Sequence, residues 1–233
     1  MGDSIKRIVE PYQDSYSPNG IIGEKDACGV GFIANIKGIE SNWILKQSLK
    51  GLNCMEHRGG CGGDSDSGDG AGILCSIPWG YLDKEMNLIN NQKLDRGLGM
   101  VFMPNKKEKI EECKSICEEE AEKLRFKETS WRTVPVNNEI LGPLAKANAP
   151  FICQWILYID TKDNQNIERL LFQLRKRIEK KIRETFKNDV GDCEFYFASL
   201  SSQTVVYKGM VRSEILSEFY QDLKKENFKV FFS

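Results

Sequence analysis

Residues 28–36, CGVGFIANI, decide the expected fold, because they are the first run of small, apolar and β-branched residues in the chain. Such a run predicts a strand that is buried on both faces of a sheet. The residues before it, 1–27, are polar and are interrupted by proline and glycine, a pattern typical of an extended leader. We therefore expect the folded domain to begin at Cys28.

The pattern of apolar residues predicts the elements that follow. Helices are expected where apolar residues recur at three- and four-residue spacing, and strands where short apolar runs end at turn residues. The expected helices cover residues 41–57, 106–124, 167–186 and 213–227. The expected strands cover 71–77, 98–103, 151–159, a hairpin of 195–200 and 204–207, and a final strand at 229–232 with nothing to pair it. This order predicts an α+β sandwich with sheets packed between helices.

The composition of the 233-residue chain is that of a globular protein, with 40% hydrophobic residues, 29% charged residues and a net charge of -1. No stretch approaches the roughly 20 apolar residues that a membrane span needs. Lysine and glutamate are interleaved, so there is no basic patch for a nucleic-acid backbone. We expect neither a membrane nor a nucleic acid as a partner.

The chain start also predicts the compartment. The first residues lack the basic start, apolar middle and small-residue cleavage site of a secretory signal. An intracellular, soluble protein is therefore expected, in a cytoplasm or a plastid stroma. In such a reducing compartment, the eight cysteines are free thiols, ligands or nucleophiles before they are disulfides.

Cys28 is the candidate nucleophile, because it opens the first expected strand directly after the leader, in the run DACGVGFIA. If the chain is cut between Ala27 and Cys28, one residue presents a thiol and a free α-amine, with ordinary pKa values of about 8.5 and about 8. The amine can then act as the base for its own thiol. A Cys-His pair would instead need His57, the sole histidine. A buried structural thiol is the alternative for Cys28 taken alone.

Other cysteines give weaker signals. Cys54, His57 and Cys61 follow the spacing C-x2-H-x3-C, which imitates a metal site, but a fourth ligand is missing and no metal is expected. Cys113 and Cys117 lie four residues apart in an expected helix and are expected to pack in the core. The charged runs of the helices are expected to be solvated faces.

Five segments in a fixed order resemble the glutamate synthases. The resemblance covers essentially the whole chain after Ala27, and the order of the five segments makes it specific. It implies a class II glutamine amidotransferase domain over residues 28–233, with residues 1–27 as leader or propeptide. The segments are CGVGFIANI from Cys28, MEHRGG from Met55, DGAGIL from Asp69, WRTVPVN from Trp131 and SLSSQTVVYKGM from Ser199.

The resemblance implies a fold and a reaction. The fold is that of an N-terminal nucleophile hydrolase, a four-layer αββα sandwich, expected to be incomplete at the C-terminus of this chain. In the reaction, the Cys28 thiolate attacks the γ-amide of glutamine, a thioester forms with release of ammonia, and water frees glutamate. Arg58 matches the arginine of the family's His-Arg-Gly segment, so Arg58 and Gly59 are expected to support the loop at the nucleophile.

The resemblance also implies partners beyond this chain. Ammonia would reach synthase domains of the same polypeptide, where 2-oxoglutarate is aminated and reduced with flavin mononucleotide and an iron-sulfur cluster. Ferredoxin or NAD(P)H would supply the electrons. No cofactor is expected within residues 28–233, and no substrate-binding residue is identified, because the family's carboxylate-binding arginine and oxyanion-hole Asn-Gly pair are expected beyond Ser233.

Two alternatives remain open from the sequence. The domain could belong to another class II amidotransferase, which feeds ammonia to sugars, purines or asparagine, although WRTVPVN and VVYKGM favour glutamate synthase. Alternatively, the chain is a truncated, catalytically inactive module that packs against other domains. The missing binding segments support that alternative, and they predict that residues 1–233 alone hydrolyse glutamine very poorly.

Overall fold

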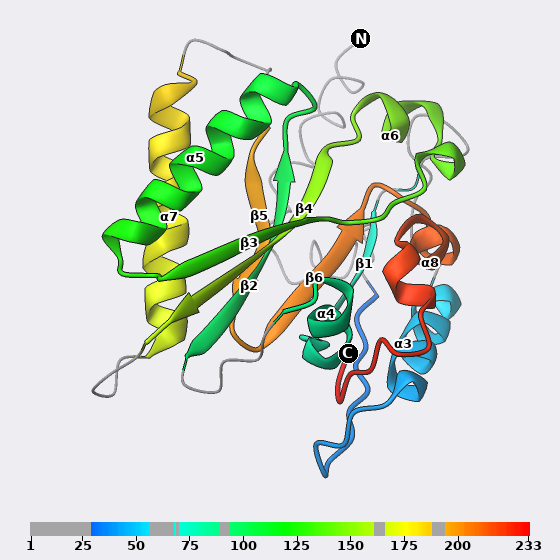
Figure 1. Cartoon of the computed structure of the whole chain (residues 1–233). Coiled ribbons are helices and arrows are strands. Elements are labelled where there is room, and N and C mark those ends of the chain that lie inside the picture. Colours follow the sequence, from blue (N-terminus) through cyan, green and yellow to red (C-terminus); the bar gives the residue numbers. More distant parts are fainter. Residues whose placement is uncertain (1–28, 56–67, 69, 89–93, 161–165, 188–193) are drawn as a thin grey trace, which may run out of the picture. The chain divides into compact units, whose positions relative to one another are not determined.

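A computed structural model describes residues 29–55, 68, 70–88, 94–160, 166–187 and 194–233. The chain divides into two compact units, Met1–Val30 and Gly31–Ser233. The second unit is α+β (Figure 1). Its elements are α3 (Asn42–Cys54), β1 (Ala71–Ser76), α4 (Trp79–Glu85), β2 (Asp95–Met103), α5 (Lys107–Lys123), β3 (Glu128–Thr133), η3 (Asn138–Ile140), α6 (Pro143–Ala147), β4 (Phe151–Ile159), α7 (Ile167–Thr185), β5 (Tyr196–Ser201), β6 (Thr204–Gly209), η4 (Ser213–Ile215), α8 (Leu216–Phe219) and η5 (Gln221–Lys224).

The larger sheet has four strands in the order β3-β4-β2-β5, and all neighbouring strands are antiparallel. β2 and β4 pair along their whole length at its centre. β4 is buried from residue 152 to residue 159, as expected for the near-continuous apolar run that predicted it.

Two helices, α5 and α7, cover one face of this sheet (Figure 1). The inner stripe of α7 has the three- and four-residue spacing of an amphipathic helix, so the prediction at 167–186 is confirmed. Trp155 of β4 is fully buried under these helices and stacks on Trp131 of β3, with 4.9 Å between ring centroids. The buried residues of α7 are Leu171, Leu174, Ile178 and Ile182.

One charged residue of α5 differs from the expectation that the charged residues of the helices are solvated. Glu120 is only 6% exposed, and its carboxylate accepts hydrogen bonds from Arg177 of α7 at 2.7 Å and from Lys123 at 2.6 Å. Burial alone would raise the pKa of Glu120, but the bonds from Lys123 and Arg177 lower it below its ordinary value. The prediction of a solvated charge is therefore wrong at this position, because Glu120 ties α5 to α7.

The smaller sheet pairs β1 with β6, antiparallel, from Ala71 and Gly209 to Ser76 and Thr204. β5 and β6 are consecutive in the chain, but β5 pairs with β2 in the larger sheet. The predicted hairpin is therefore wrong, and its turn carries the chain from one sheet to the other. Glu168 of α7 holds this turn, because its Oε1 accepts from the Ser202 amide at 2.6 Å.

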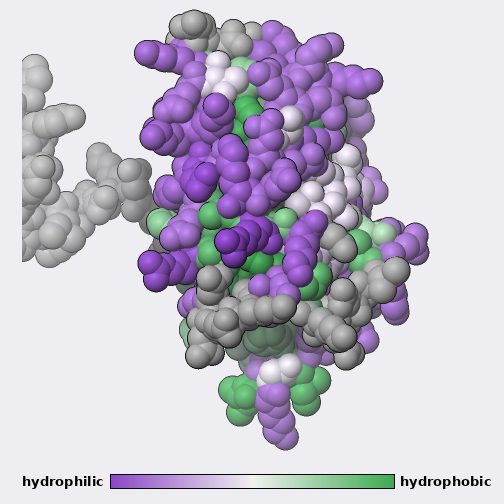
Figure 2. Space-filling view, turned by 60° about the vertical axis from the view of Figure 1, so that its left-hand side comes forward, coloured by the Kyte–Doolittle hydropathy of each residue, from purple (hydrophilic) through white to green (hydrophobic). Residues whose placement is uncertain are grey.

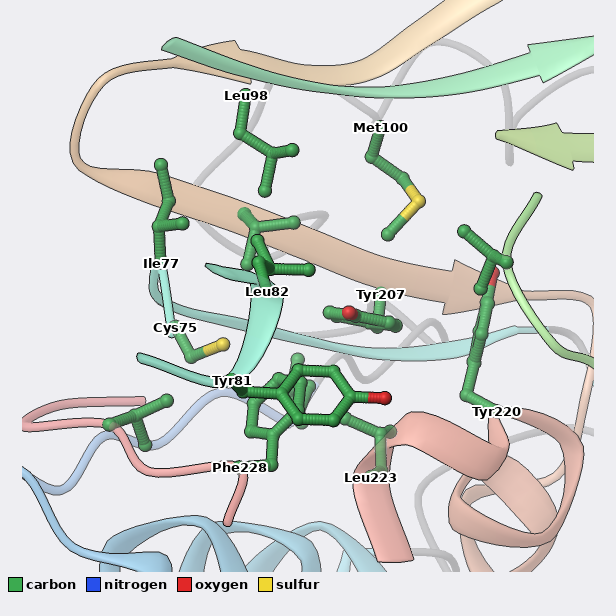
Figure 3. Packing of buried hydrophobic residues seen from close by; sticks show 14 of the residues in the cluster. Cys75, Ile77, Tyr81, Leu82, Leu98, Met100, Tyr207, Tyr220, Leu223 and Phe228 are labelled. Carbon is green, nitrogen blue, oxygen red and sulfur yellow. The ribbon is translucent and has the colours of Figure 1, made fainter. Parts of the chain in front are cut away.

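A second hydrophobic cluster joins the two sheets to α3 and the C-terminal residues. Figure 3 shows Leu98 and Met100 pointing from β2 toward Tyr207 of β6 and Tyr81 of α4, with Phe228 below them. Because these side chains come from both sheets and from the chain's last residues, their burial fixes all three relative to one another.

The buried strand expected at residues 28–36 is not observed in its described part, residues 29–36. Ala34 forms an isolated bridge with Phe232, while Phe32 is 91% exposed and Ile36 is 100% exposed. At the bottom of Figure 2, green hydrophobic side chains project into solvent from the loop before α3, above its purple hydrophilic tip. Phe32 and Ile36 are two even-numbered positions of one extended segment, so they share a face, and that face is in solvent.

The C-terminal residues differ from the prediction in two ways. The helix expected at 213–227 is divided into η4, α8 and η5, because Tyr220 has extended backbone angles, φ -90 and ψ 100, and forms a bridge with Val136. The final strand is also not without a partner, since the Val230 and Ser233 amides donate to the carbonyls of Ser41 and Ile33.

The helices α4 and α6 and the strand β3 have no counterpart in the prediction. α4 and α6 are too short to show a helical period, with seven and five residues. β3 is an edge strand of polar character, ETSWRT, which lacks a continuous apolar run. In addition, the first helix ends at Cys54, before the predicted end at residue 57.

The close approach of β1 to β6 gives a prediction. A Cβ at Gly72 would lie 2.7 Å from Lys208 Cβ and 2.8 Å from the carbonyl oxygen of Tyr207. We expect Gly72→Ala to lower the free energy of unfolding by about 1–3 kcal/mol, measured by urea denaturation. The control is Gly80→Ala in α4, where a Cβ meets nothing within 4 Å. Equal losses in both variants would contradict the prediction.

Candidate active site

The expected active-site residues Cys28, Arg58 and Gly59 lie outside the described residues. The leader, residues 1–27, and the possible metal ligands His57 and Cys61 lie outside them as well. The described residues next to them in the sequence form three segments. These are the segment after Cys28, the helix α3 that leads to Arg58, and the strand β1 that follows the glycine-rich loop.

The segment after Cys28 is hydrogen-bonded to the last residues of the chain. The Ile33 amide donates to the Ser233 carbonyl at 2.8 Å, and the Ser233 amide donates back to Ile33 at 3.0 Å. The Asn35 amide donates to the Phe231 carbonyl at 2.8 Å. This antiparallel pairing fixes residues 33–35 against the last residues of the chain.

The same C-terminal residues are bonded to the end of β1 on their other side. The Ser76 amide donates to the Phe232 carbonyl at 3.2 Å, and the Phe231 amide donates to Ser76 Oγ at 3.0 Å. Ser76 is 1% exposed. Residues 231–233 thus lie between residues 33–35 and β1, and they extend the smaller sheet to the segment after Cys28.

The start of α3 is also held by the C-terminal residues. Ser41 caps the helix by accepting from the Ile44 amide, and its own amide donates to the Val230 carbonyl at 2.9 Å. Asn42 Nδ2 donates to the carbonyls of Lys225 and Phe228, each at 3.0 Å. The helix that precedes Arg58 is therefore placed by the same strand as the segment after Cys28.

A buried polar cluster joins β3, α4, β4 and β6 to η5. Arg132 of β3 forms two bonds to Asp222 of η5, Nη1 to Oδ2 at 2.7 Å and Nη2 to Oδ1 at 2.8 Å. The Tyr81 hydroxyl donates to Asp222 Oδ1 at 2.7 Å. Gln154 Nε2 donates to the Tyr207 hydroxyl at 2.8 Å, and that hydroxyl donates to Asp222 Oδ2 at 3.3 Å. Gln154 Oε1 accepts from Arg132 at 2.8 Å, which closes a ring of hydrogen bonds.

Burial and charge shift the pKa values within this cluster. Burial, together with the neighbouring Asp222, raises the pKa of Tyr81, and burial raises that of Tyr207. Burial alone would lower the pKa of Arg132, but its bonds to Asp222 raise it. Both tyrosines thus stay neutral donors beside an ion pair. The sequence-based prediction did not include this cluster, and its only signal was the WRTVPVN segment that contains Arg132.

A pocket of about 990 Å³ opens at the start of β1. Its walls are mostly apolar and include Leu74, Tyr196 and Met210, with Lys208 and Glu194 as charged lining residues. This volume lies within the size range of ligand pockets, about 300–1,000 Å³. The described lining residues include no thiol and no imidazole, and the pocket offers room for a small molecule.

The described cysteines form no disulfide with one another and differ in exposure. Cys54 is exposed at the end of α3, whereas Cys75, Cys113, Cys117 and Cys153 are buried. The prediction that Cys113 and Cys117 pack in the core is confirmed. Burial raises the pKa of Cys75 to about 12 and that of Cys153 to about 12. At neutral pH the Cys75 and Cys153 thiols therefore stay protonated, and a protonated thiol is a poor nucleophile.

The raised thiol pKa values predict a loss of stability in alkali. The pKa of Cys75 and of Cys153 is about 12 in the folded state and lies near its ordinary value of 9.0 in the unfolded state. The folded state therefore holds these protons more tightly, and stability present below pH 9 is lost as the pH rises toward 12. Urea denaturation between pH 9 and pH 12 should show the free energy of unfolding falling with pH, and it should fall less steeply in Cys75→Ala. The same dependence on pH in Cys75→Ala and in the unchanged protein would contradict the raised pKa of Cys75.

Comparison with known protein families shows which family this chain belongs to. The chain matches the family described as "Glutamine amidotransferases class-II" over residues 28–233. The match begins at Cys28, the residue that the sequence suggested as nucleophile. The described helices include none long and apolar enough to cross a membrane.

The chain is also similar to several glutamate synthases. It is 43% identical over 224 residues to "Ferredoxin-dependent glutamate synthase, chloroplastic" of Oryza sativa subsp. japonica, covering 94% of this chain and 14% of that protein. It is 45% identical over 213 residues to "Ferredoxin-dependent glutamate synthase 1, chloroplastic/mitochondrial" of Arabidopsis thaliana, covering 90% and 13%. It is 42% identical over 212 residues to "Ferredoxin-dependent glutamate synthase 2" of a Synechocystis strain. That match covers 89% of this chain and 13% of that protein. The chain thus spans 13–14% of the length of these relatives, and the resemblance inferred from the five segments is confirmed.

Proposed function

Because the chain belongs to the class-II glutamine amidotransferases, we propose that it carries the glutaminase site of a glutamate synthase and releases ammonia from glutamine at Cys28. The observation that carries this proposal is that the family match starts at Cys28 itself. A nucleophile with a free α-amine has to be the first residue of the mature chain, and the match starts where such a chain would start.

The proposed reaction uses the thiol and amine of one residue. The α-amine takes the thiol proton, and the thiolate sulfur forms a bond to the γ-carbonyl carbon of glutamine. Collapse of the tetrahedral adduct breaks the carbon-nitrogen bond, and ammonia leaves with the transferred proton. Water then cleaves the thioester, which releases glutamate and restores the thiol. Arg58 and Gly59 support the loop beside the nucleophile.

The proposed fold is the four-layer αββα sandwich of N-terminal nucleophile hydrolases. The α5–α7 layer on the four-stranded sheet supports the first two layers. The shared cluster that joins this sheet to β1, β6 and α3 supports the second sheet and its helix.

The proposed partners follow from the relatives. Ammonia passes to synthase domains of the same polypeptide, where 2-oxoglutarate is aminated and reduced with flavin mononucleotide and an iron-sulfur cluster. The relatives' names support ferredoxin as the electron donor. We therefore place the enzyme in an aqueous compartment that supplies reduced ferredoxin, such as a plastid stroma.

The proposal predicts cleavage of the Ala27–Cys28 bond. The purified active protein should begin at Cys28, because only then is the α-amine free to act as base. N-terminal sequencing together with intact mass measurement checks this. A variant with Ala27→Pro, which hinders cleavage of that bond, should retain the leader and lack glutaminase activity. Active enzyme that keeps Met1 or Gly2 would contradict the proposal.

A further inference from the structure

The helices α5 and α7 lie side by side on one face of the larger sheet (Figure 1). Arg177 of α7 bonds to Glu120 of α5, with 2.7 Å between Nε and Oε2. Lys109, near the start of α5, lies over the ring of Phe186, just after the end of α7, at 5.9 Å from its centroid. These two contacts place residue 120 beside residue 177 and residue 109 beside residue 186, so the helices are antiparallel.

The outward face of α5 is acidic. The buried residues of this helix recur on one side of it, and exposed glutamates recur at three- and four-residue spacing on the opposite side. Residues with this spacing form one stripe along a helix. The acidic stripe consists of Glu108, Glu111, Glu112, Ser115, Glu119 and Glu122.

The outward face of α7 is mostly basic, and it shows the same helical spacing. Lys176 lies 3.1 Å from Glu179, and Lys180 lies 3.9 Å from Glu184. These ion pairs stay within α7 and involve exposed lysines, so they contribute little and can be exchanged for pairs with another molecule. Figure 2, in which this side of the molecule comes forward, shows it largely covered by hydrophilic side chains. The basic stripe consists of Arg169, Gln173, Lys176, Lys180, Arg183 and Lys187.

The two stripes lie along the same length of the helical layer. Because residue 109 lies beside residue 186 and residue 120 beside residue 177, the acidic stripe at 108–122 is level with roughly residues 175–187 of the basic stripe. A layer with one acidic and one basic helix at the same level is complementary to a second copy of itself. A two-fold axis along the seam between the helices places α5 of each copy on α7 of the other.

We propose that the face formed by the acidic and basic stripes is a contact between two copies of this chain, in which the acidic stripe of each copy binds the basic stripe of the other. In this contact, Glu112 of one copy is level with Arg183 of the other, and Glu119 is level with Lys176 and Lys180. Phe172 is 60% exposed and lies one turn before Lys176, so the contact also covers an apolar ring. The contact does not involve Cys28 and is independent of the proposed function.

The charges determine the orientation of the second copy more than the strength of the dimer. A copy turned about an axis across the helices would place glutamates on glutamates and bases on bases, which is repulsive. Because each exposed ion pair contributes little, the dimer is expected to be weak, with a Kd between about 10 µM and about 1 mM. Salt should weaken it further, because it screens exposed charges.

Sedimentation equilibrium of the full chain measures this association. In about 50 mM salt, the mass should rise from one copy toward two with protein concentration, and about 500 mM salt should raise the Kd tenfold or more. A mass of one copy at every concentration up to about 1 mM would overturn the proposal and would point to unlike, charged partners for the two stripes. A Kd that does not change with salt would also overturn it.

A charge swap tests which stripe binds which. One variant reverses the basic stripe with Lys180→Glu and Arg183→Glu, and the other reverses the acidic stripe with Glu112→Lys and Glu119→Lys. Each variant alone should be a monomer, because like charges then meet. An equimolar mixture should form a one-to-one dimer with a Kd within about tenfold of that of the unchanged chain. A mixture that stays monomeric, or that forms assemblies larger than a pair, would overturn the two-fold contact.

The matched control is Lys50→Glu with Lys229→Glu, which makes the same change of net charge as the reversed basic stripe. Both lysines are exposed and lie outside the two stripes, in α3 and near the end of the chain. This control should associate as the unchanged chain does, and an equal loss of association would overturn the proposal. If the reversed basic stripe does not fold, as judged by circular dichroism, Lys180→Gln with Arg183→Gln should raise the Kd about tenfold. An unchanged Kd in that variant would overturn the proposal.

Discussion

Replacing Cys28 with alanine is expected to abolish glutamine-dependent glutamate synthesis while leaving synthesis from added ammonia intact. The alanine cannot form the thioester, and loss of a catalytic nucleophile lowers turnover by roughly four to six orders of magnitude. Ammonia supplied in solution bypasses the glutaminase step and still reaches the synthase site. The measurement is glutamate formation by the complete enzyme, with glutamine or with an ammonium salt as nitrogen source.

Two control variants sharpen this experiment. Cys54→Ala removes an exposed thiol at the end of α3 and should leave both activities unchanged. His57→Ala should spare glutamine hydrolysis far more than Cys28→Ala, because the α-amine is the proposed base. A folded His57→Ala enzyme that had lost all glutamine hydrolysis would indicate a Cys-His mechanism and refute the amine as base.

The parts of the fold that could be predicted from the sequence are those determined by local periodicity. α7 repeats apolar residues at helical spacing, and β4 is a continuous apolar run, so each carries its own signal. Both were predicted within a residue or two of their observed bounds. The predicted helix over 106–124 also agrees with α5, including the inward positions of Cys113 and Cys117.

The parts that could not be predicted depend on partners far away in the chain. The sequence of residues 195–207 is typical of a hairpin, but β5 pairs with β2 and β6 pairs with β1. The C-terminal helix is broken at Tyr220, where the backbone turns to bridge Val136. Such pairings are tertiary, and no window of neighbouring residues contains them.

The candidate site shows the same division. Cys28 became the candidate nucleophile from its place in the sequence, directly after a leader and at the start of an apolar run, together with the family resemblance. The cluster around Asp222 was not, because its members Tyr81 and Arg132 stand 141 and 90 residues away. A single aspartate in a polar stretch, YQDLKKEN, resembles a solvated residue until the fold brings its partners to it.

Trp155→Ala is expected to destabilise the fold more than Gly72→Ala or any of the cysteine substitutions. The Trp155 ring is 0% exposed, stacks on Trp131 at 4.9 Å and faces Phe197 at 6.4 Å between centroids. Removing a buried tryptophan ring leaves a cavity that costs about 3–5 kcal/mol of unfolding free energy. Urea denaturation, followed by circular dichroism, measures this loss.

Trp155→Phe is the matched variant, because it keeps an aromatic ring in the same place. Trp155 Nε1 has no hydrogen-bond partner among the described residues, so the indole N–H is a buried polar group whose removal offsets part of the lost volume. Trp155→Phe should therefore lose about half as much stability as Trp155→Ala, or less. Equal losses in the two variants would mean that the indole N–H is satisfied and that more than ring packing holds β4 against α5 and α7.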